Sequence, residues 1–303
     1  MKRTSIHFIV NPISGNGNNL LTPETVSRVF NLDQFCFEIK ETQKPKHATE
    51  LTNASIIEGA DIIVACGGDG TVNEIASCLV GSSVKLGVVP MGSGNGFAAT
   101  LKIPKSIIGA LNIIKESNNT QIDVGEINKN YFFSNTGIGF DANVINNYSK
   151  TSQRKLTSYL RAFLLTFFNN PASHTLKITT ESQSMKLKPF MVFASNSNEM
   201  GYDVSLTPKA STQDGVLDII IVEPLNKLEI IYFAFLLLIK KPQRFKKAHY
   251  FLTKNTEITN FDKGGFLAQI DGEPRQINTN TIKITVKKKA LSVVVPQNPN
   301  ELR

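Results

Sequence analysis

A glycine turn between a buried strand and a helix start is the feature that most constrains how this chain can fold. In the segment IVACGGDGTVNEIA, residues 63–76, three glycines follow a short apolar run at 61–65. The run is β-branched and uninterrupted, which predicts a strand buried on both faces. Thr71 is the expected helix cap, and Glu74, three residues on, completes a capping-box spacing. The segment therefore predicts strand, glycine turn and helix N-terminus, a place where backbone N–H groups can hold phosphate.

Asp69 stands in the middle of this turn. A carboxylate repels phosphate unless a cation lies between them, so the turn suits a nucleotide that carries Mg²⁺. It is not a Walker A loop, because no Gly-Lys-Ser/Thr follows, and it is not GxGxxG, because Asn73 occupies the last glycine position. For this loop alone, a tight turn with a capping aspartate is an equal alternative.

The first half of the chain alternates strand patterns with helical spacing of apolar residues, which predicts a parallel sheet covered by helices. The expected strands are SIHFIVNP, FCFEIKET, ADIIVACGG and VKLGVVPMG. Clusters rich in glycine and asparagine, NPISGNG, GGDG and MGSGNG, follow three of them. Ligands bind at the carboxyl ends of strands in such sheets. We therefore expect the three loops at one sheet edge, where chance turns are a poor explanation.

From about residue 124 the pattern changes to short strands of alternating polarity. Helical stretches interrupt them at about 154–169 and 225–240. This pattern predicts antiparallel pairing, as a sandwich or an open barrel.

Composition bounds the class of protein. A length of 303 residues predicts about two domains, and 41% hydrophobic with 19% charged residues is typical of a folded globular chain. The three cysteines have no metal-type spacing and cannot all pair in disulfides, which indicates a reducing compartment. The apolar stretch at 228–239 is shorter than the roughly 20 residues that span a bilayer. We expect neither a transmembrane helix nor a signal peptide.

The net charge of +8 comes from the second half, since residues 1–125 carry −1 and residues 126–303 carry +9. A basic half indicates an anionic partner, which can be a membrane surface, nucleic acid or a phosphate-bearing substrate. The apolar stretches 156–168 and 228–239, with basic residues at 240–247, favour an anionic membrane. A core helix followed by a solvated basic face is an equal alternative.

Three motifs, NPxSG at 11–15, GGDGTVNE at 67–74 and GSGN at 92–95, occur in an order and spacing that resemble the catalytic domain of the diacylglycerol kinase family. That family includes bacterial lipid kinases and the sphingosine kinases. Further matches cover nearly the whole chain: Thr42, His47-Ala48, Asp123-Val124-Gly125, Gly137 to Asp141, Asp214 to Asp218, and Asp271 to Pro274.

The resemblance implies a domain organisation. It predicts an α/β nucleotide-binding domain over 1–123 with a parallel sheet of the NAD kinase/phosphofructokinase type. A mainly antiparallel β-sandwich that takes the lipid substrate is expected over 124–290. Residues 291–303 are expected to pack back on the first domain.

The resemblance also implies site residues, carried over position by position. Asp69 would lie beside Mg²⁺ and the phosphates, and Glu273 would act as general base on the lipid hydroxyl. The expected ATP-binding residues are Asn11, Ser14, Gly15, Thr42, Gly67, Gly68, Asp69, Gly70, Thr71, Asn73 and Ser93. A second, structural Mg²⁺ is expected at Ser211, Asp214 and the backbone of Val216, with Asp123 nearby, although a plain turn is an equal alternative there.

The residues themselves give looser support for Glu273. Asp271 and Glu273 are two apart in IDGEP, so in a strand they would face one way. A buried carboxylate near a second one has a raised pKa and can accept a proton near neutral pH. A solvated turn is the alternative.

One position departs from the family pattern. Many bacterial diacylglycerol kinases have aspartate where this chain has Gly96, in the loop GSGNGFAA. Sphingosine kinases have a small residue there. The difference favours a lipid alcohol other than diacylglycerol, such as a sphingoid base.

Together these observations predict an ATP- and Mg²⁺-dependent kinase that phosphorylates a lipid alcohol in a cleft between its domains. The alternatives are a soluble small-molecule kinase of the NAD kinase type and a non-catalytic protein whose basic half binds nucleic acid or membrane. We expect no nucleic-acid partner, a cytoplasmic chain at the inner face of the membrane, and leave a homodimer open.

Overall fold

A computed structural model describes residues 2–15, 21–151, 156–169, 173–200, 204–262 and 264–297. The chain divides into two compact units. The first consists of residues 1–123 with 288–303, and the second of residues 124–287. The expected positions Asn16 and Gly17 of the first glycine loop lie outside the described residues.

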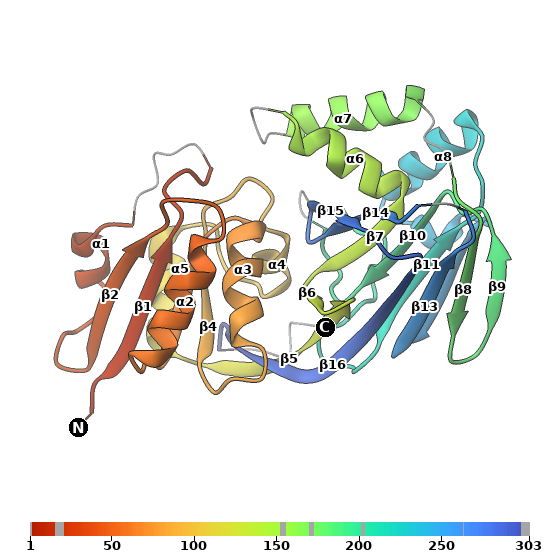
Figure 1. Cartoon of the computed structure of the whole chain (residues 1–303). Helices are drawn as coiled ribbons and strands as arrows, with labels where there is room; N and C mark the ends of the chain where they lie inside the picture. Colours follow the sequence, from red (N-terminus) through yellow and green to blue (C-terminus); the bar gives the residue numbers. More distant parts are fainter. Residues whose placement is uncertain are drawn as a thin grey trace. The chain divides into compact units, whose positions relative to one another are not determined.

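A parallel sheet runs through the first unit (Figure 1). Its strands follow the order β2-β1-β3-β4-β16. Their bounds are β1 Thr4–Val10, β2 Phe35–Glu41, β3 Ile62–Gly67, β4 Lys85–Pro90 and β16 Thr281–Val294, whose last residues belong to this unit. Every residue of β3 is buried, as its apolar run predicts. The predicted parallel α/β architecture is confirmed.

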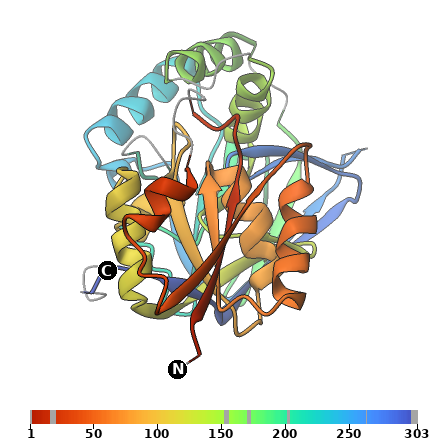
Figure 2. The same cartoon turned by 90° about the vertical axis from the view of Figure 1, so that its left-hand side faces the viewer.

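Helices cover both faces of this sheet, as Figure 2 shows with α2 and α3 on one side and α5 on the other. The helices are α1 Pro23–Ser27, α2 His47–Ile57, α3 Asp69–Leu79, α4 Gly96–Thr100 and α5 Ile107–Glu116. Side-chain caps begin two of them. Thr22 accepts from the Thr25 N–H at α1, and Ser106 accepts from the Gly109 N–H at α5.

The expected cap of α3 was wrong. The helix begins at Asp69, and its N-cap is Gly68, which has no side chain to offer. Thr71 lies in the first turn, and its hydroxyl accepts a hydrogen bond from Asn11. An acidic residue in the first turn interacts favourably with the helix dipole, so Asp69 suits its place.

The second unit contains two antiparallel sheets. One has the order β12-β11-β10-β7-β14-β15, and in this unit the other runs β16-β13-β8-β9, with β5 and β6 beside it. The bounds are β5 Asn119–Ile127, β6 Asn130–Phe132, β7 Asn135–Gly139, β8 Leu176–Thr180, β9 Ser184–Leu187, β10 Met191–Ser195, β11 Leu217–Val222, β12 Ala248–Thr253, β13 Asn255–Asn260, β14 Phe266–Ile270 and β15 Glu273–Ile277. The predicted antiparallel β-rich second half is confirmed.

The six-stranded sheet is buried on both faces, and its alternating side chains enter two different cores. On β10, Val192 and Ala194 pack in a core shared with Ile178 of β8 and Ile258 of β13. Met191 and Phe193 point to the opposite face, into a core shared with helices. The sheet is therefore one half of a sandwich and also the floor of a helical layer.

The helical layer consists of α6 Phe140–Ser149, α7 Leu156–Asn169 and α8 Lys227–Leu238, followed by the 3₁₀ turn Pro242–Arg244 (Figure 1). Two of these helices match the predicted helical stretches, although residues 154–155 of the first stretch lie outside the described part. Helix α6 was not predicted, because only three of its ten residues are buried and its apolar period is weak. Among the described residues, no helix has the length and apolarity needed to cross a bilayer.

We predict that Phe193→Ala lowers the free energy of unfolding by about 3–5 kcal/mol, because Phe193 is fully buried between the sheet and the helices. Urea unfolding followed by circular dichroism measures the change. Leu252→Ala on β12 is the matched control, since Leu252 is 66% exposed, and it should shift stability by less than about 0.5 kcal/mol. Equal losses in both variants would contradict the assignment of this core.

Candidate active site

Three loops follow β1, β3 and β4, and the structure brings them together at the carboxyl edge of the parallel sheet. The three strands run parallel, so their ends meet at one edge. The N–H of Asn11 donates to the carbonyl of Cys66 at 2.9 Å, and the N–H of Met91 donates to that of Gly67 at 2.9 Å. Each loop is therefore tied to the next by the backbone itself.

Glycines are required where these loops touch. A Cβ on Gly92 would lie 2.5 Å from the Cα of Gly68, and a Cβ on Gly15 would lie 2.4 Å from the carbonyl oxygen of Met91. Gly15 also has φ +67, in the left-handed region. The loops thus pack backbone against backbone, which leaves main-chain N–H groups close to the first turn of α3.

Asp69 lies where these loops meet. The backbone N–H of Phe97 donates to its Oδ1 at 3.3 Å, and its Oδ2 would lie 3.3 Å from a Cβ on Gly94. Burial raises the pKa of Asp69, while hydrogen bonds from the backbone of Phe97, Gly96 and Asn95 lower it and only partly compensate. A cation beside this carboxylate would favour its charged form, so the donor fits a Mg²⁺ that accompanies phosphate.

The remaining predicted nucleotide residues lie at the ends of β1, β2, β3 and β4 and on α3. The Asn11 side chain donates to the Thr71 hydroxyl at 3.0 Å and joins the first loop to α3. Thr42 follows β2, and its N–H donates to the Val10 carbonyl at 2.9 Å. Ser14 and Asn73 lie in the first loop and in the second turn of α3, and Ser93 is exposed in the third loop.

Glu273 begins strand β15, directly after a two-residue hairpin turn. Asp271 and Gly272 form the turn with φ +46 and +80, as the Asp-Gly pair favours in a tight hairpin. The sequence argument that Asp271 and Glu273 share one strand face is therefore wrong, because Asp271 belongs to the turn. Its carboxylate accepts the backbone N–H groups of Phe133, Ser134 and Asn135 at 2.8–3.0 Å. Asp271 positions the hairpin and with it Glu273.

A buried polar network supports the same hairpin. The Gln269 side chain donates to Asn135 Oδ1 at 2.9 Å and to Asp141 Oδ2 at 3.4 Å, and its Oε1 accepts the Gly272 N–H at 3.0 Å. Burial raises the pKa of Asp141 to about 7, and its Oδ1 is shielded from solvent without a hydrogen-bond partner. Sequence reasoning missed Gln269 and gave Asp141 no role. The only signal was the motif GIGFDA, in which a carboxylate follows two glycines.

The loop at 211–216 has the form of a turn closed by its own side chains. Ser211 Oγ accepts the Gln213 N–H at 3.3 Å, and Asp214 Oδ1 accepts the Val216 N–H at 3.1 Å. Burial and the charge of Asp214 raise the pKa of Asp218 to about 6. Two carboxylates that repel each other, Asp214 and Asp218, are oxygen donors of the kind that a hard cation binds.

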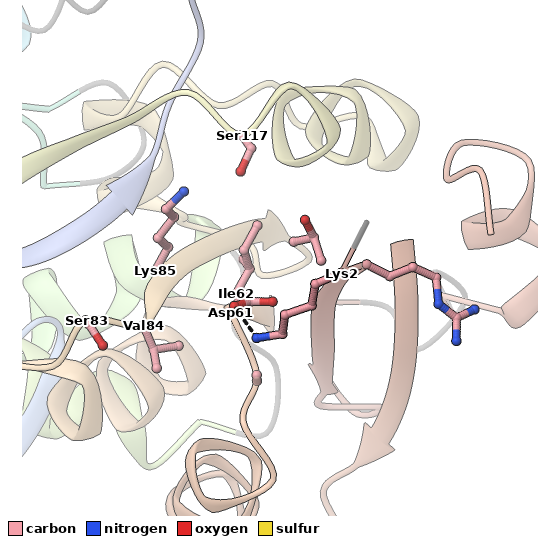
Figure 3. A pocket seen from close by; sticks show the side chains of 10 residues that line it. Lys2, Asp61, Ile62, Ser83, Val84, Lys85 and Ser117 are labelled. Atoms are coloured by element: carbon pink, nitrogen blue, oxygen red, sulfur yellow. Dashed lines mark ion pairs between the residues drawn. The ribbon is translucent and has the colours of Figure 1, made fainter. Parts of the chain in front are cut away.

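Two other features of the first unit lie away from the glycine loops. His7, Glu38 and Glu58 bring ligand-type atoms within 4.8 Å of one another, but the Lys40 ammonium pairs with both carboxylates and takes the place that a metal cation would need. A hollow of about 360 Å³ lies where the strands begin, lined by Lys2, Arg3, Lys85 and an Asp61 that pairs with Lys2 (Figure 3). It lies at the amino ends of these strands, whereas the glycine loops lie at their carboxyl ends.

We predict that Asp141→Asn changes how stability depends on pH. A raised carboxyl pKa means that the folded wild type keeps a proton which the unfolded chain has lost, so its stability falls as pH rises from about 4 to about 7. The unfolding free energy of Asp141→Asn minus that of the wild type should therefore rise by about 2–3 kcal/mol from pH 5 to pH 8. Denaturant titrations at both pH values measure it. A difference that does not change with pH would contradict the buried carboxyl.

Comparisons with known proteins agree with this geometry. Residues 5–127 match the family model "diacylglycerol kinase catalytic domain", and residues 134–241 match the "YegS C-terminal NAD kinase beta sandwich-like domain". A diacylglycerol kinase of Staphylococcus aureus is 28% identical over 277 residues, which cover 89% of this chain and 86% of that protein.

Solved structures show the same architecture. A Bacillus anthracis protein described as a candidate diacylglycerol kinase is 25% identical, with a TM-score of 0.81 over 99% of this chain and 97% of its own. An NAD kinase from Archaeoglobus fulgidus in complex with ATP shares the fold alone, at 12% identity and a TM-score of 0.52 over 96% of this chain and 94% of its own. Residues 5–127 thus carry a diacylglycerol kinase catalytic domain, and the chain is a kinase that transfers phosphate to an alcohol.

Proposed function

We propose that this protein uses ATP and Mg²⁺ to phosphorylate a hydroxyl of a lipid alcohol, of the diacylglycerol or sphingoid-base type. The observation that carries the proposal is the backbone-to-backbone packing of Gly68 and Gly92 next to Asp69. Phosphoryl transfer needs positioning and charge neutralisation more than covalent help, and this arrangement supplies both. The match to the diacylglycerol kinase catalytic domain supports a lipid as the acceptor.

In this mechanism the nucleotide phosphates bind to N–H groups of the three glycine loops and to the N-terminus of α3. Asn11, Ser14, Thr42, Asn73 and Ser93 surround the rest of the nucleotide. Asp69 would hold Mg²⁺, which would neutralise charge on the phosphates. Ser211, Asp214 and the backbone of Val216 would hold a second, structural Mg²⁺.

Glu273 is the proposed general base. It takes the proton of the lipid hydroxyl as the hydroxyl oxygen attacks the γ-phosphorus, the bond to the bridging β–γ oxygen breaks, and ADP leaves with both electrons of that bond. Asp271 and Gln269 act through Glu273 by holding its hairpin. The enzyme would work in the cytoplasm, at the inner face of a membrane that contains its substrate.

Gly96 bears on the choice of substrate. It begins α4 directly after Asn95, is buried, and its N–H is one of the backbone donors to Asp69. A side chain with a carboxylate at this position would lie near the acceptor hydroxyl in the proposed mechanism. Its absence favours a lipid alcohol other than diacylglycerol. Transfer of labelled γ-phosphate into a total lipid extract, followed by identification of the product, decides between diacylglycerol and another lipid alcohol.

We predict that Asp69→Asn, which weakens binding of Mg²⁺, and Glu273→Gln, which removes the general base, each lower turnover by at least about a hundredfold while the chain stays folded. The measurement is ATP-dependent transfer of labelled phosphate to the lipid extract, with NAD as a parallel acceptor. Wild-type activity in either variant would remove that residue from the mechanism. Phosphorylation of NAD but no lipid would favour a soluble kinase of the NAD kinase type.

We predict that Gly92→Ala raises the KM for ATP at least about tenfold, because its Cβ would push the third glycine loop away from Gly68. Gly59→Ala is the control, since a Cβ at Gly59 meets nothing within 4 Å although its φ is +82. The control should lose about 1 kcal/mol of stability and keep its KM. Unchanged KM values in both variants would contradict nucleotide binding by these loops.

A further inference from the structure

Exposed large hydrophobic side chains are concentrated on two helices of the second unit. Of the seventeen such residues in the described part of the chain, eleven lie on α7 and at or next to α8. We call them the apolar face: Leu156, Leu160, Leu164, Leu165 and Phe168 on α7, and Leu228, Ile231, Tyr232, Phe235, Leu238 and Ile239 on and directly after α8. An exposed patch of this kind on a folded protein marks an interaction site.

The apolar face is one side of each helix. On α7, Leu156, Leu160, Leu164 and Phe168 recur every four residues, while Ala162 is buried on the other side. On α8, the exposed residues recur at intervals of three and four, and Ile230, Phe233 and Leu236 fill the core beneath. Helix α8 is therefore apolar on both sides, with only the inner side covered by the protein.

The two helices lie on the same side of the six-stranded sheet (Figure 1). Lys227, the first residue of α8, places its ammonium 5.9 Å from the ring centroid of Phe167 and 5.8 Å from that of Phe168. The last turn of α7 therefore lies near the first turn of α8, where the exposed residues Phe168 and Leu228 stand.

The charges around the apolar face have one sign. Exposed basic residues follow α8 at Lys240, Lys241, Arg244 and Lys246, and Arg161 is exposed on α7. In the described residues of α7, α8 and the segment to Lys247, Glu229 is the one acidic residue, and it pairs with Lys247 at 2.7 Å. A large apolar surface with a cationic border complements a layer of hydrocarbon beneath anionic headgroups.

We propose that the apolar face inserts into the interfacial layer of an anionic membrane, with α7 and α8 parallel to its surface. The choice of a membrane as partner rests on the proposed lipid kinase function and names the surface through which that enzyme reaches its substrate. Pairing of the face with a second copy of this chain would bring the same basic border against itself, which electrostatic repulsion disfavours. Helices of 14 and 12 residues lie in the interface and do not span it.

A tryptophan reporter tests the insertion directly, because the chain contains no tryptophan. Phe235→Trp places a single indole in the apolar face at a site 54% exposed, and Leu252→Trp places one on β12 at a site 66% exposed. The vesicles are phosphatidylcholine with about one third phosphatidylglycerol, the anionic component that attracts basic residues. The Phe235→Trp emission should shift to the blue and be quenched by brominated acyl chains, and the Leu252→Trp emission should do neither. No shift for Phe235→Trp would overturn the proposal.

Vesicle flotation of the full chain without ATP measures separately what the apolar side chains and the basic side chains contribute to membrane binding. Phe168→Gln with Leu238→Gln should lower the partition coefficient about a hundredfold, since each removes a large side chain from the interface. Ile57→Gln with Leu252→Gln is the apolar control, because both residues are exposed outside the face, and it should change nothing. Equal binding by the two double variants would overturn the proposal.

The exposed basic residues that follow α8 form the border of the apolar face, and their role is tested against an equal loss of charge elsewhere. Lys241→Gln, Arg244→Gln and Lys246→Gln together should lower binding to the anionic vesicles by about a hundredfold at low salt, at roughly 5-fold per residue. Lys102→Gln, Lys105→Gln and Lys115→Gln remove the same charge from exposed positions of the first unit and should cost less than about fivefold. Equal losses in both triple variants would overturn the role of the border.

The outcomes separate this proposal from the proposed function. Flotation that depends on the apolar face, without phosphorylation of any lipid, supports the membrane surface and contradicts the kinase substrate. Phosphorylation of a short-chain soluble lipid alcohol, with flotation that ignores the face, does the reverse. A dimer in light scattering that Phe168→Gln with Leu238→Gln dissociates, with no vesicle binding, would assign the face to a second copy and overturn the membrane.

Discussion

The close approach of two glycine backbones governs the first unit. Where Gly68 and Gly92 meet there is no room for a side chain on Gly92, so the loops after β3 and β4 touch through main-chain atoms at this point. This one contact determines where α3 begins, because Gly68 is its N-cap, and it determines the surroundings of Asp69. A parallel sheet aligns the strand ends, and the missing side chains let those ends converge, as the proposed binding of a nucleotide requires.

In the second unit, buried polar side chains and their hydrogen bonds hold the hairpin of Glu273 in place. Its central sheet is buried on both faces, so each strand must satisfy two cores at once, and the polar groups left inside must find partners. The carboxylate of Asp271 binds three successive N–H groups, and Gln269 connects Asn135, Asp141 and the hairpin turn. Asp271 and Gln269 hold the hairpin and are themselves fixed by hydrogen bonds, which favours a defined position for Glu273.

What the sequence could predict follows from how local each signal is. The strand, turn and helix around GGDG were predictable because glycine and β-branched residues act within a few positions, and the parallel order followed from alternation. The cap of α3 was not predictable, because the Thr71 hydroxyl binds Asn11, sixty residues away. Helix α6 and strand β12 carry weak periodicity and depend on the sheet beneath or beside them. The role of Asp271 depends on amides at 133–135, which no local pattern around IDGEP reveals.

The pairing of strand β16 determines which unit can finish folding first as the chain is synthesised. Its first residues pair with β13 in the second unit, and its last residues pair with β4 in the first, as at Val293 and Leu86. The N–H of Lys289 also donates to the buried carboxylate of Asp123 at 2.7 Å. A nascent chain therefore has every residue of the second unit before it has the part of β16 that completes the parallel sheet of the first unit. An isolated fragment that ends at residue 123 would carry an open sheet edge beside β4 and a buried aspartate without its amide.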